Sequence, residues 1–243
     1  MPDPIADLSL PHVHQLEMQY TWLQGARTRM FRFVDVNHRL RVLDLGSGKG
    51  HVTAELSRRC PGKVFALDCS IKSLHEELYP EESFRIAGIS GKIPFQSSSF
   101  DLVFTQNSLM WMKPLGQVIS EIWRILEPGG WLVAIEPDYG GLIEFPPSVV
   151  LKDIWTAALT RSGAEPLIGR MLPTLLETSG FQVRVFLFDR VELTGSERID
   201  LIKDLVLTEG ERKRLNEVES SIARKSGWQQ LAHLPYFLIA ARK

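Results

Sequence analysis

The stretch from Val42 to Gly50, VLDLGSGKG, constrains this chain most, because it joins an apolar run to three closely spaced glycines. The apolar residues at its start are typical of a buried parallel strand. The glycines permit a tight turn and let the backbone come close to a ligand. We therefore expect a strand that ends in a ligand-binding turn, with the acid Asp44 two residues before the first glycine.

An acidic residue also ends the second apolar run. Asp68 lies about twenty residues beyond the glycines, where a carboxylate can accept hydrogen bonds from both hydroxyls of a ribose. Such a carboxylate would repel a 2′-phosphate, which counts against NADP. The alternative is that Asp68 caps the next helix. Cys69 would line the adenine side of the ligand, and because nothing nearby activates its thiol, we assign it to packing.

Composition narrows the class of protein. The 243 residues are 44% hydrophobic and 23% charged, which is ordinary for one α/β domain with a modest insertion. A formal net charge of -1 argues against a broad basic face, so we expect no nucleic-acid partner. The start, MPDPIADLSLPH, lacks the features of a signal peptide, and no apolar run is as long as a membrane span. The two cysteines are too few for a disulfide framework, so we expect a cytoplasmic protein. Their spacing is not that of zinc ligands, so we expect no metal site. We also expect no membrane partner.

Apolar runs alternate with helical segments in the order of a doubly wound α/β sheet. Seven strands are expected, at residues 41–45, 64–67, 84–87, 101–105, 131–135, 181–188 and 236–241. Helices are expected at about 50–60, before the turn Glu127-Pro128-Gly129-Gly130, and at about 148–162 and 166–179.

Two segments lie outside this alternation. Residues 1–38 carry apolar positions at helical spacing and are expected to form a helical cover. Residues 39–243 would then form the main domain, with a charged helical insertion at about 196–228. Both segments could cover a site. The alternative for each is a packing helix with a solvated outer face.

The glycine turn differs from the dinucleotide fingerprint G-x-G-x-x-G, because its third glycine comes one residue early and an acid precedes the first. This pattern resembles motif I of the class I S-adenosylmethionine-dependent methyltransferases. Two later segments, AGISGKIPF followed by SFDLV, and EIWRILEPGG, resemble those of the UbiE-like, type 11 members. The resemblance covers about Val42 to Ala134 and extends more loosely to Lys243. It implies an enzyme with a Rossmann-like, seven-stranded sheet, mostly parallel with an antiparallel last strand.

The resemblance also implies S-adenosylmethionine as the cofactor and S-adenosylhomocysteine as the product. The glycine turn would face the methionine portion and the ribose, and the polar residues that end the fourth strand would meet the methionine moiety. A tyrosine on the N-terminal helix could reach the cofactor carboxylate, as could Arg27 or Arg29. The expected cofactor-binding residues are Tyr20, Asp44, Gly46, Ser47, Gly48, Gly50, Asp68, Cys69, Ile89, Ser90, Gln106 and Asn107.

The chain departs from the family pattern at two places. Ile89 stands where related chains usually have the aspartate that holds the adenine amino group. Adenine would therefore be held by backbone groups of Ile89 and Ser90 and by apolar contact. Related chains often place a histidine shortly after the fourth strand, but this chain reads Leu109-Met110-Trp111-Met112. A histidine base at that point is excluded.

Two carboxylates and a phenol follow the fifth strand, at the rim where acceptors bind in similar enzymes. Glu136, Asp138 and Tyr139 are the candidate catalytic residues, which would orient the acceptor or take its proton. The alternative is a loop whose acids are merely solvated or capping. Direct displacement at an activated methyl carbon mainly needs alignment and exclusion of water, so a base is required only for a protonated acceptor.

Several functions remain open at this point. A small-molecule acceptor is expected, because the chain has no basic excess and no Asn-Pro-Pro-Tyr motif. The alternatives are an RNA or protein acceptor, a cofactor-binding protein without catalysis, and an NAD-dependent oxidoreductase. The sequence predicts neither the identity of the acceptor nor the oligomeric state.

Overall fold

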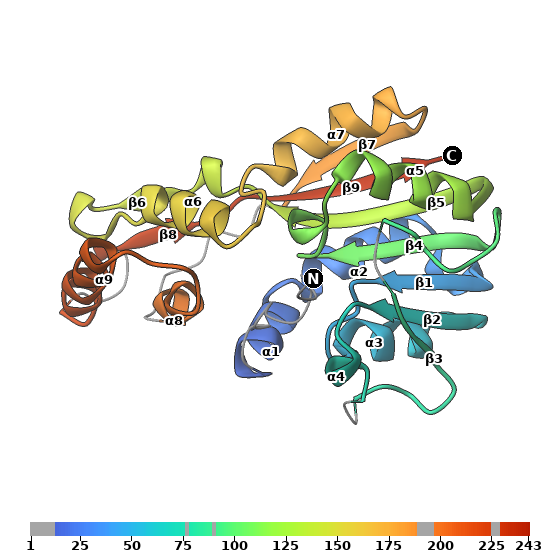
Figure 1. The fold of residues 1–243 in the computed structure, drawn as a ribbon, viewed down its shortest axis with the longest axis horizontal. Coiled ribbons are helices and arrows are strands. Elements are labelled where there is room, and N and C mark those ends of the chain that lie inside the picture. Colours follow the sequence, from blue (N-terminus) through green and yellow to red (C-terminus); the bar gives the residue numbers. More distant parts are fainter. Residues whose placement is uncertain (1–12, 76–77, 89–90, 189–196, 225–228) are drawn as a thin grey trace, which may run out of the picture.

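A seven-stranded sheet runs through the centre of the molecule (Figure 1). The computed structural model describes residues 13–75, 78–88, 91–188, 197–224 and 229–243. The strand order is β3-β2-β1-β4-β5-β9-β7; the first five strands are parallel, and β9 is antiparallel to both β5 and β7. The strands are β1 (Arg41–Leu45), β2 (Lys63–Asp68), β3 (Phe84–Ala87), β4 (Phe100–Gln106), β5 (Leu126–Pro137), β7 (Gln182–Leu187) and β9 (Tyr236–Arg242).

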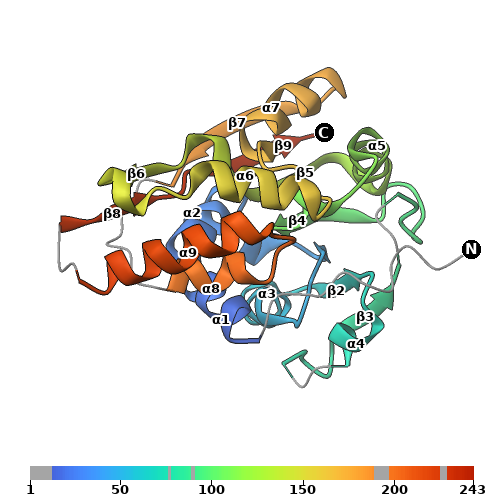
Figure 2. The ribbon, with the colours of Figure 1, turned by 60° about the vertical axis from the view of Figure 1, so that its left-hand side comes forward.

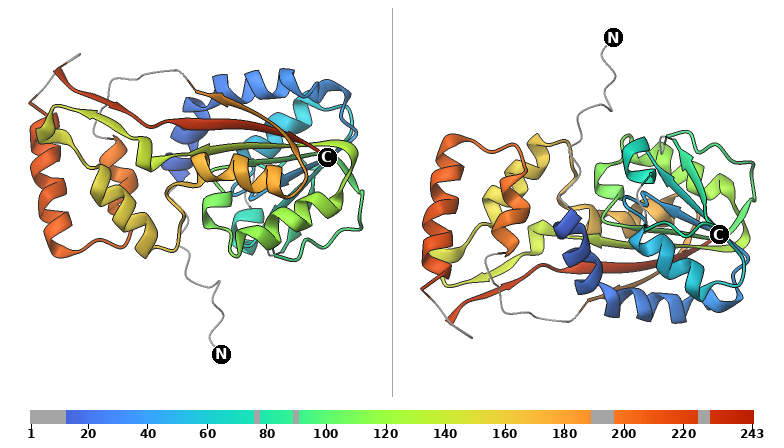
Figure 3. Two further views of the ribbon diagram at one scale, coloured as in Figure 1. Left: turned by 90° about the horizontal axis from the view of Figure 1, so that it is seen from above. Right: turned by 90° about the horizontal axis from the view of Figure 1, so that it is seen from below.

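Helices cover both faces of this sheet (Figure 3). On one face, α2 (Gln24–Phe33) and α3 (His51–Arg59) pack on side chains that include Val42, Phe104 and Leu238. On the other face, α5 (Leu115–Ile125) and α7 (Ile168–Thr178) pack on the alternate side chains of the same strands. α5 buries Val118, Ile119, Ile122 and Ile125, whose spacing forms one stripe of a helix.

A second, smaller group of elements lies beyond the carboxyl ends of the parallel strands (Figures 1 and 2). It is built on a two-stranded sheet of β6 (Ile143–Phe145) and β8 (Leu231–His233). Three helices complete this cap lobe: α6 (Lys152–Arg161), α8 (Glu197–Lys203) and α9 (Glu209–Ile222). The ion pair of Glu144 with Arg198 joins β6 to α8, and the same carboxylate accepts hydrogen bonds from the amides of Leu151 and Lys152 at the start of α6.

The remaining elements are short or terminal. They are α1 (Val13–Trp22), α4 (Ile71–Leu74) and the 3-10 turns η1 (Val36–His38), η2 (Leu109–Trp111), η3 (Tyr139–Gly141) and η4 (Pro147–Val149). The N-terminal cover thus consists of two helices rather than one, because Leu23 interrupts the helical path between α1 and α2. No helix in the described ranges is long and apolar enough to cross a membrane.

The predicted fold class is confirmed: seven strands form a doubly wound, mostly parallel sheet with an antiparallel last strand. Strand limits shift by a residue at several ends, and the fifth strand differs most. It extends through Glu136 and Pro137, which pair with β9, so Glu136 lies in β5 and not just past its end. The turn Glu127-Pro128-Gly129-Gly130, expected before the fifth strand, lies within β5, because Leu126 pairs with Phe100 and a bulge follows. Gly129 has a φ of +82° and its amide donates to the Lys243 carbonyl, which keeps the turn attached to the sheet.

Candidate cofactor and acceptor site

The glycine turn lies at the carboxyl end of β1, at the crevice where open α/β sheets bind ligands. All three of its glycines have positive φ, +76° at Gly46, +53° at Gly48 and +89° at Gly50. A Cβ on Gly46 would lie 2.4 Å from Ser108 Oγ, and one on Gly50 would lie 2.9 Å from the Tyr79 ring. Among the described residues, a Cβ on Gly48 would meet nothing within 4 Å. Gly48 is therefore the open apex of the turn, where a ligand can approach the backbone.

Asp44 lies under this turn and is almost completely buried. Its Oδ2 accepts a hydrogen bond of 2.6 Å from the hydroxyl of Thr53 on α3. Burial raises the pKa of Asp44 to about 7, against the lowering effect of the Thr53 hydroxyl, and the nearby charge of Asp68 raises it further. A carboxyl with such a perturbed pKa in a ligand crevice is a common feature of functional sites.

Asp68 ends β2 beside the turn and orients its carboxylate through two backbone amides. Oδ2 accepts from the Gly48 amide at 2.8 Å and Oδ1 accepts from the Ser70 amide at 2.9 Å. Burial raises the pKa of Asp68, and these two hydrogen bonds oppose that rise. The side chain of Ser70, rather than that of Asp68, caps α4. The neighbouring Cys69 is exposed. Partial desolvation of its thiol, together with the charge of Asp68, raises the pKa of that thiol.

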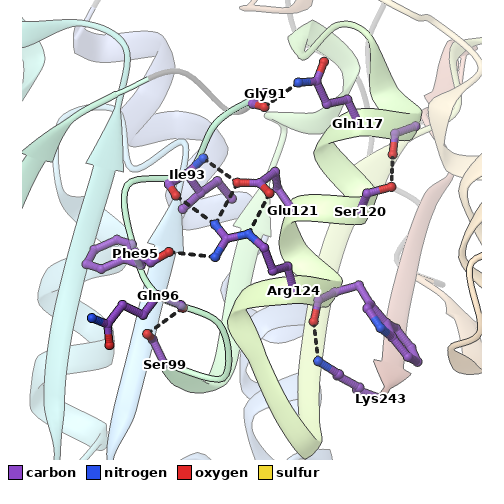
Figure 4. Close-up of polar contacts among 12 residues, drawn as sticks. Gly91, Ile93, Phe95, Gln96, Ser99, Gln117, Ser120, Glu121, Arg124 and Lys243 are labelled. Carbon is purple, nitrogen blue, oxygen red and sulfur yellow. Dashed lines mark hydrogen bonds and ion pairs between the residues drawn. The ribbon is translucent and has the colours of Figure 1, made fainter.

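Ile89 and Ser90, the residues expected beside adenine, lie outside the described residues. The segment that follows them is fixed to α5 by side chains (Figure 4). Arg124 donates to the carbonyls of Ile93 and Phe95 at 3.0 and 2.8 Å. Glu121, paired with Arg124, accepts from the Ile93 amide at 2.9 Å. Residues 91–95 are therefore held against α5. The amide of Ile93 and the carbonyls of Ile93 and Phe95 bond to α5 and not to a ligand in the crevice.

The end of β4 meets the N-terminal helices through Gln106, Asn107 and Arg27. Arg27 is completely buried; its Nε forms an ion pair of 2.8 Å with Glu55, and its Nη1 donates to Gln106 Oε1 at 3.2 Å. Its Nη2 is buried and has no hydrogen-bond partner among the described residues. Asn107 adopts a left-handed backbone with φ of 54° and donates to Gln19 of α1 at 3.2 Å.

Tyr20 of α1 belongs to the same group of side chains. The Arg27 guanidinium lies 4.1 Å from the centre of the Tyr20 ring, and the ring of His51 lies 5.4 Å away on α3. The glycine turn, the two buried acids and the polar end of β4 thus meet the N-terminal helices at one edge of the sheet. Apart from Ile89 and Ser90, the structure brings the expected cofactor residues to this edge.

The three candidate catalytic residues have different surroundings. Glu136 is completely buried, and its Oε1 accepts from the amides of Ser108 and Leu109 at 3.1 and 3.0 Å. Its Oε2 has no hydrogen-bond partner among the described residues, and burial raises its pKa to about 7. Asp138, in contrast, accepts three hydrogen bonds of 2.7 to 3.0 Å from Arg170.

Tyr139 packs its ring 5.0 Å from that of Trp155 on α6, and desolvation raises its phenol pKa. The phenol of Tyr236 is also buried, and the charges of Tyr139 and Glu136 add to the rise of its pKa. Of the three candidates, Glu136 therefore retains a buried carboxylate oxygen without a hydrogen-bond partner among the described residues, whereas Asp138 is already engaged by Arg170.

Among the residues of this edge that were not anticipated from the sequence, Thr53 and Tyr79 contact the glycine turn or the acid beneath it. Thr53 orients Asp44, and its place in the first turn of the helix after the glycine turn is a signal that could have identified it. Tyr79 contacts the turn from the segment between α4 and β3, and no sequence pattern predicts that contact. In the part of the chain that the structure describes, no group of three or more His, Cys, Asp or Glu side chains could hold a metal ion.

Comparison with known proteins is consistent with this geometry. Residues 43–134 match the methyltransferase domain family Methyltransf_11. The chain is 29% identical to the biotin biosynthesis bifunctional protein BioHC of Cellvibrio japonicus, and this match covers 69% of the present chain. It is 28% identical to the arginine-hydroxylase NDUFAF5 of Mus musculus, and this match covers 82% of the present chain. It is 30% identical to the demethylmenaquinone methyltransferase of Lactiplantibacillus plantarum over 54% of its length. The matches span 32%, 56% and 55% of these relatives, respectively.

Solved structures share the fold at low sequence identity. The YcgJ protein of Bacillus subtilis has a TM-score of 0.64 at 14% identity, over 89% of this chain and 98% of that one. A SAM-dependent methyltransferase of Archaeoglobus fulgidus has a TM-score of 0.58 at 15% identity, over 90% of this chain and 94% of that one. The matched domain and the methyltransferase relatives identify residues 43–134 as a methyltransferase domain, and the fold of the chain is similar to that of S-adenosylmethionine-dependent methyltransferases.

Proposed function

We propose that the protein binds S-adenosylmethionine at the glycine turn and transfers its methyl group to a small-molecule acceptor by direct in-line displacement. The observation that carries this proposal is the open apex at Gly48 beside the oriented carboxylate of Asp68. A ligand can approach the backbone there while its ribose hydroxyls donate to the carboxylate.

The residues at the crevice fit the cofactor. Asp68 would hold the ribose, and the buried Nη2 of Arg27, which lacks a partner among the described residues, suits the cofactor carboxylate. Asp44 is a buried acid near both groups and would favour the cofactor ammonium. When bound, the cofactor supplies a methyl carbon already activated by its sulfonium charge. The remaining task of the chain is to align the acceptor and exclude water.

Glu136 is the residue best suited to accept a proton, should the acceptor carry one. Its Oε2 lacks a partner in the described part of the chain, and its pKa of about 7 matches the operating range of a general base. Asp138 would instead fix the loop of η3 through Arg170. Tyr139, with its raised phenol pKa, would orient the acceptor rather than deprotonate it.

A protein acceptor is the second candidate. The match to a relative named malonyl-[acyl-carrier protein] O-methyltransferase over 68% of this chain favours it, whereas the match to demethylmenaquinone methyltransferase favours a small molecule. Methyl transfer from labelled cofactor into a small-molecule extract or into a protein extract of the source cells separates the two candidates.

Isothermal titration with S-adenosylmethionine, S-adenosylhomocysteine and NAD tests the cofactor. Both sulfur nucleosides should bind and NAD should not. Asp68→Ala should abolish detectable binding because it removes the ribose acceptor. The matched control is Asp101→Ala: Asp101 is equally buried and also accepts two backbone amides, those of Leu40 and Arg41, but it lies at the amino end of β4. Unchanged affinity of the Asp68 variant would remove this residue from the site.

A further inference from the structure

Tyr79 is a buried tyrosine that contacts the glycine turn from outside the family motifs. It lies between α4 and β3 and is 5% exposed. Its ring packs with Ala66 and Leu74 in a small apolar cluster. The ring also covers Gly50, since a Cβ at that glycine would come within 2.9 Å of it. Packing alone would be served equally by phenylalanine, so the hydroxyl requires a separate explanation.

The hydroxyl of Tyr79 makes two hydrogen bonds, both to the glycine turn. It donates to the Gly48 carbonyl at 2.6 Å, and it lies 2.9 Å from Ser47 Oγ. A phenol has a single proton. Because that proton is directed to Gly48, Ser47 is the donor in the second hydrogen bond.

Gly48 is thereby held at both of its polar backbone groups. Its amide donates to Asp68 Oδ2 and its carbonyl accepts from Tyr79. No described residue packs where its side chain would be, so these two hydrogen bonds set the orientation of the apex. Without the phenol, the Gly48 carbonyl would lose this hydrogen bond, and a glycine imposes little resistance to rotation of its peptide groups.

We propose that Tyr79 is a positioning residue for the cofactor: its hydroxyl fixes the Gly48 peptide, and through the Gly48 amide it fixes the direction of the Asp68 carboxylate. This proposal rests on the proposed function, because it concerns the site at which S-adenosylmethionine would bind. Tyr79 acts through Gly48 and Asp68, so its removal lowers affinity for adenosine-containing ligands without altering the fold.

The test compares Tyr79→Phe with Ser83→Ala in the full chain. Ser83 is a buried residue of the same segment whose hydroxyl donates to the Pro80 carbonyl at 2.7 Å. The Ser83 change therefore removes the same kind of hydrogen bond without contact to the turn. The Kd for S-adenosylhomocysteine is measured by titration, the folded state by thermal unfolding without ligand, and local exchange by mass spectrometry of peptides spanning residues 45–52.

Tyr79→Phe should raise the Kd about two- to tenfold, because the turn is then no longer pre-organised for the ligand, and should speed amide exchange in residues 45–52 only. Each variant loses one buried hydroxyl and should therefore lower the unfolding temperature by a similar small amount, whereas the Kd of the Ser83 variant should match the wild type. An unchanged Kd for Tyr79→Phe, or equal weakening by both variants, overturns the positioning role while leaving the proposed function intact. If the wild-type protein itself does not bind S-adenosylhomocysteine, the proposed function fails first and this inference fails with it.

Discussion

Replacing Glu136 with glutamine should change how the stability of this protein depends on pH. The Glu136 carboxyl is completely buried, and its Oε1 accepts the amides of Ser108 and Leu109. A glutamine oxygen can accept the same two amides, while the group that titrates is removed. The substitution therefore isolates the free energy of ionising this side chain inside the protein.

The pKa of Glu136 is raised from its ordinary value of 4.5 to about 7 by burial. A folded-state pKa above the unfolded one favours the protonated form in the fold, so stability is fully present below pH 4.5 and is lost as the pH rises through 7. At about 1.4 kcal/mol per pH unit, a shift of 2.5 units amounts to about 3 kcal/mol. Most of this loss falls between pH 5 and pH 8. Asp44, whose pKa is also raised to about 7, titrates in both proteins and cancels in the comparison.

Urea unfolding followed by circular dichroism at pH 5 and pH 8 measures the effect. Between these pH values, the unfolding free energy of Glu136→Gln should rise relative to wild type by about 2 to 3 kcal/mol. Glu217→Gln is the control, because the Glu217 side chain is 54% exposed and should show no such change. A difference between variant and wild type that is the same at both pH values would refute the argument. So would a difference that moves in favour of the wild type.

The other predictions concern the glycine turn and the cap lobe. In thermal unfolding, Gly46→Ala should destabilise the fold well beyond Gly48→Ala. The alanine Cβ at position 46 would lie 2.4 Å from Ser108 Oγ. The alanine Cβ at position 48 would meet no atom of the described residues within 4 Å, so that change costs only about 1 to 2 kcal/mol of backbone strain. Equal losses would contradict this difference. Arg198→Met should cost about 3 to 5 kcal/mol, because it leaves the Glu144 carboxylate buried without its cation. Adding Glu144→Gln should recover part of that loss in urea unfolding, and no recovery would count against the ion pair.

The parts of the fold that local sequence determines were predictable. β1 and β3 have the expected limits, and the helix of α5 follows from its apolar stripe. The three-residue strands β6 and β8 were not predicted, because each is too short to show a period and their pairing joins residues about ninety positions apart. The break between α1 and α2 at Leu23 was not predicted either.

For the site, the sequence predicted which residues lie at the carboxyl edge but not which of their atoms are engaged. The acids Glu136 and Asp138 were equivalent candidates in the sequence. They differ in the structure because Arg170 from α7 engages Asp138, whereas Glu136 retains an oxygen without a partner in the described ranges. Contacts such as those of Tyr79 and Arg27 join segments distant along the chain, and a single sequence contains no local signal for them.

The burial of Arg27 limits how the N-terminal cover could open to admit a molecule as large as a nucleoside. Lifting α2 would bring a fully desolvated guanidinium into water and separate it from Glu55, in addition to exposing the apolar side chains around it. α1, by comparison, contacts the fold through the 3.2 Å hydrogen bond from Asn107 to Gln19, through the ring of Tyr20 against His51 of α3, and through the ring of Trp22, which packs edge-on against Tyr236 of β9. Opening at α1 would withdraw the Trp22 ring from Tyr236, whereas opening at α2 would separate the buried ion pair of Arg27 and Glu55. The second opening is the more costly of the two, because it exposes a buried charge on each side.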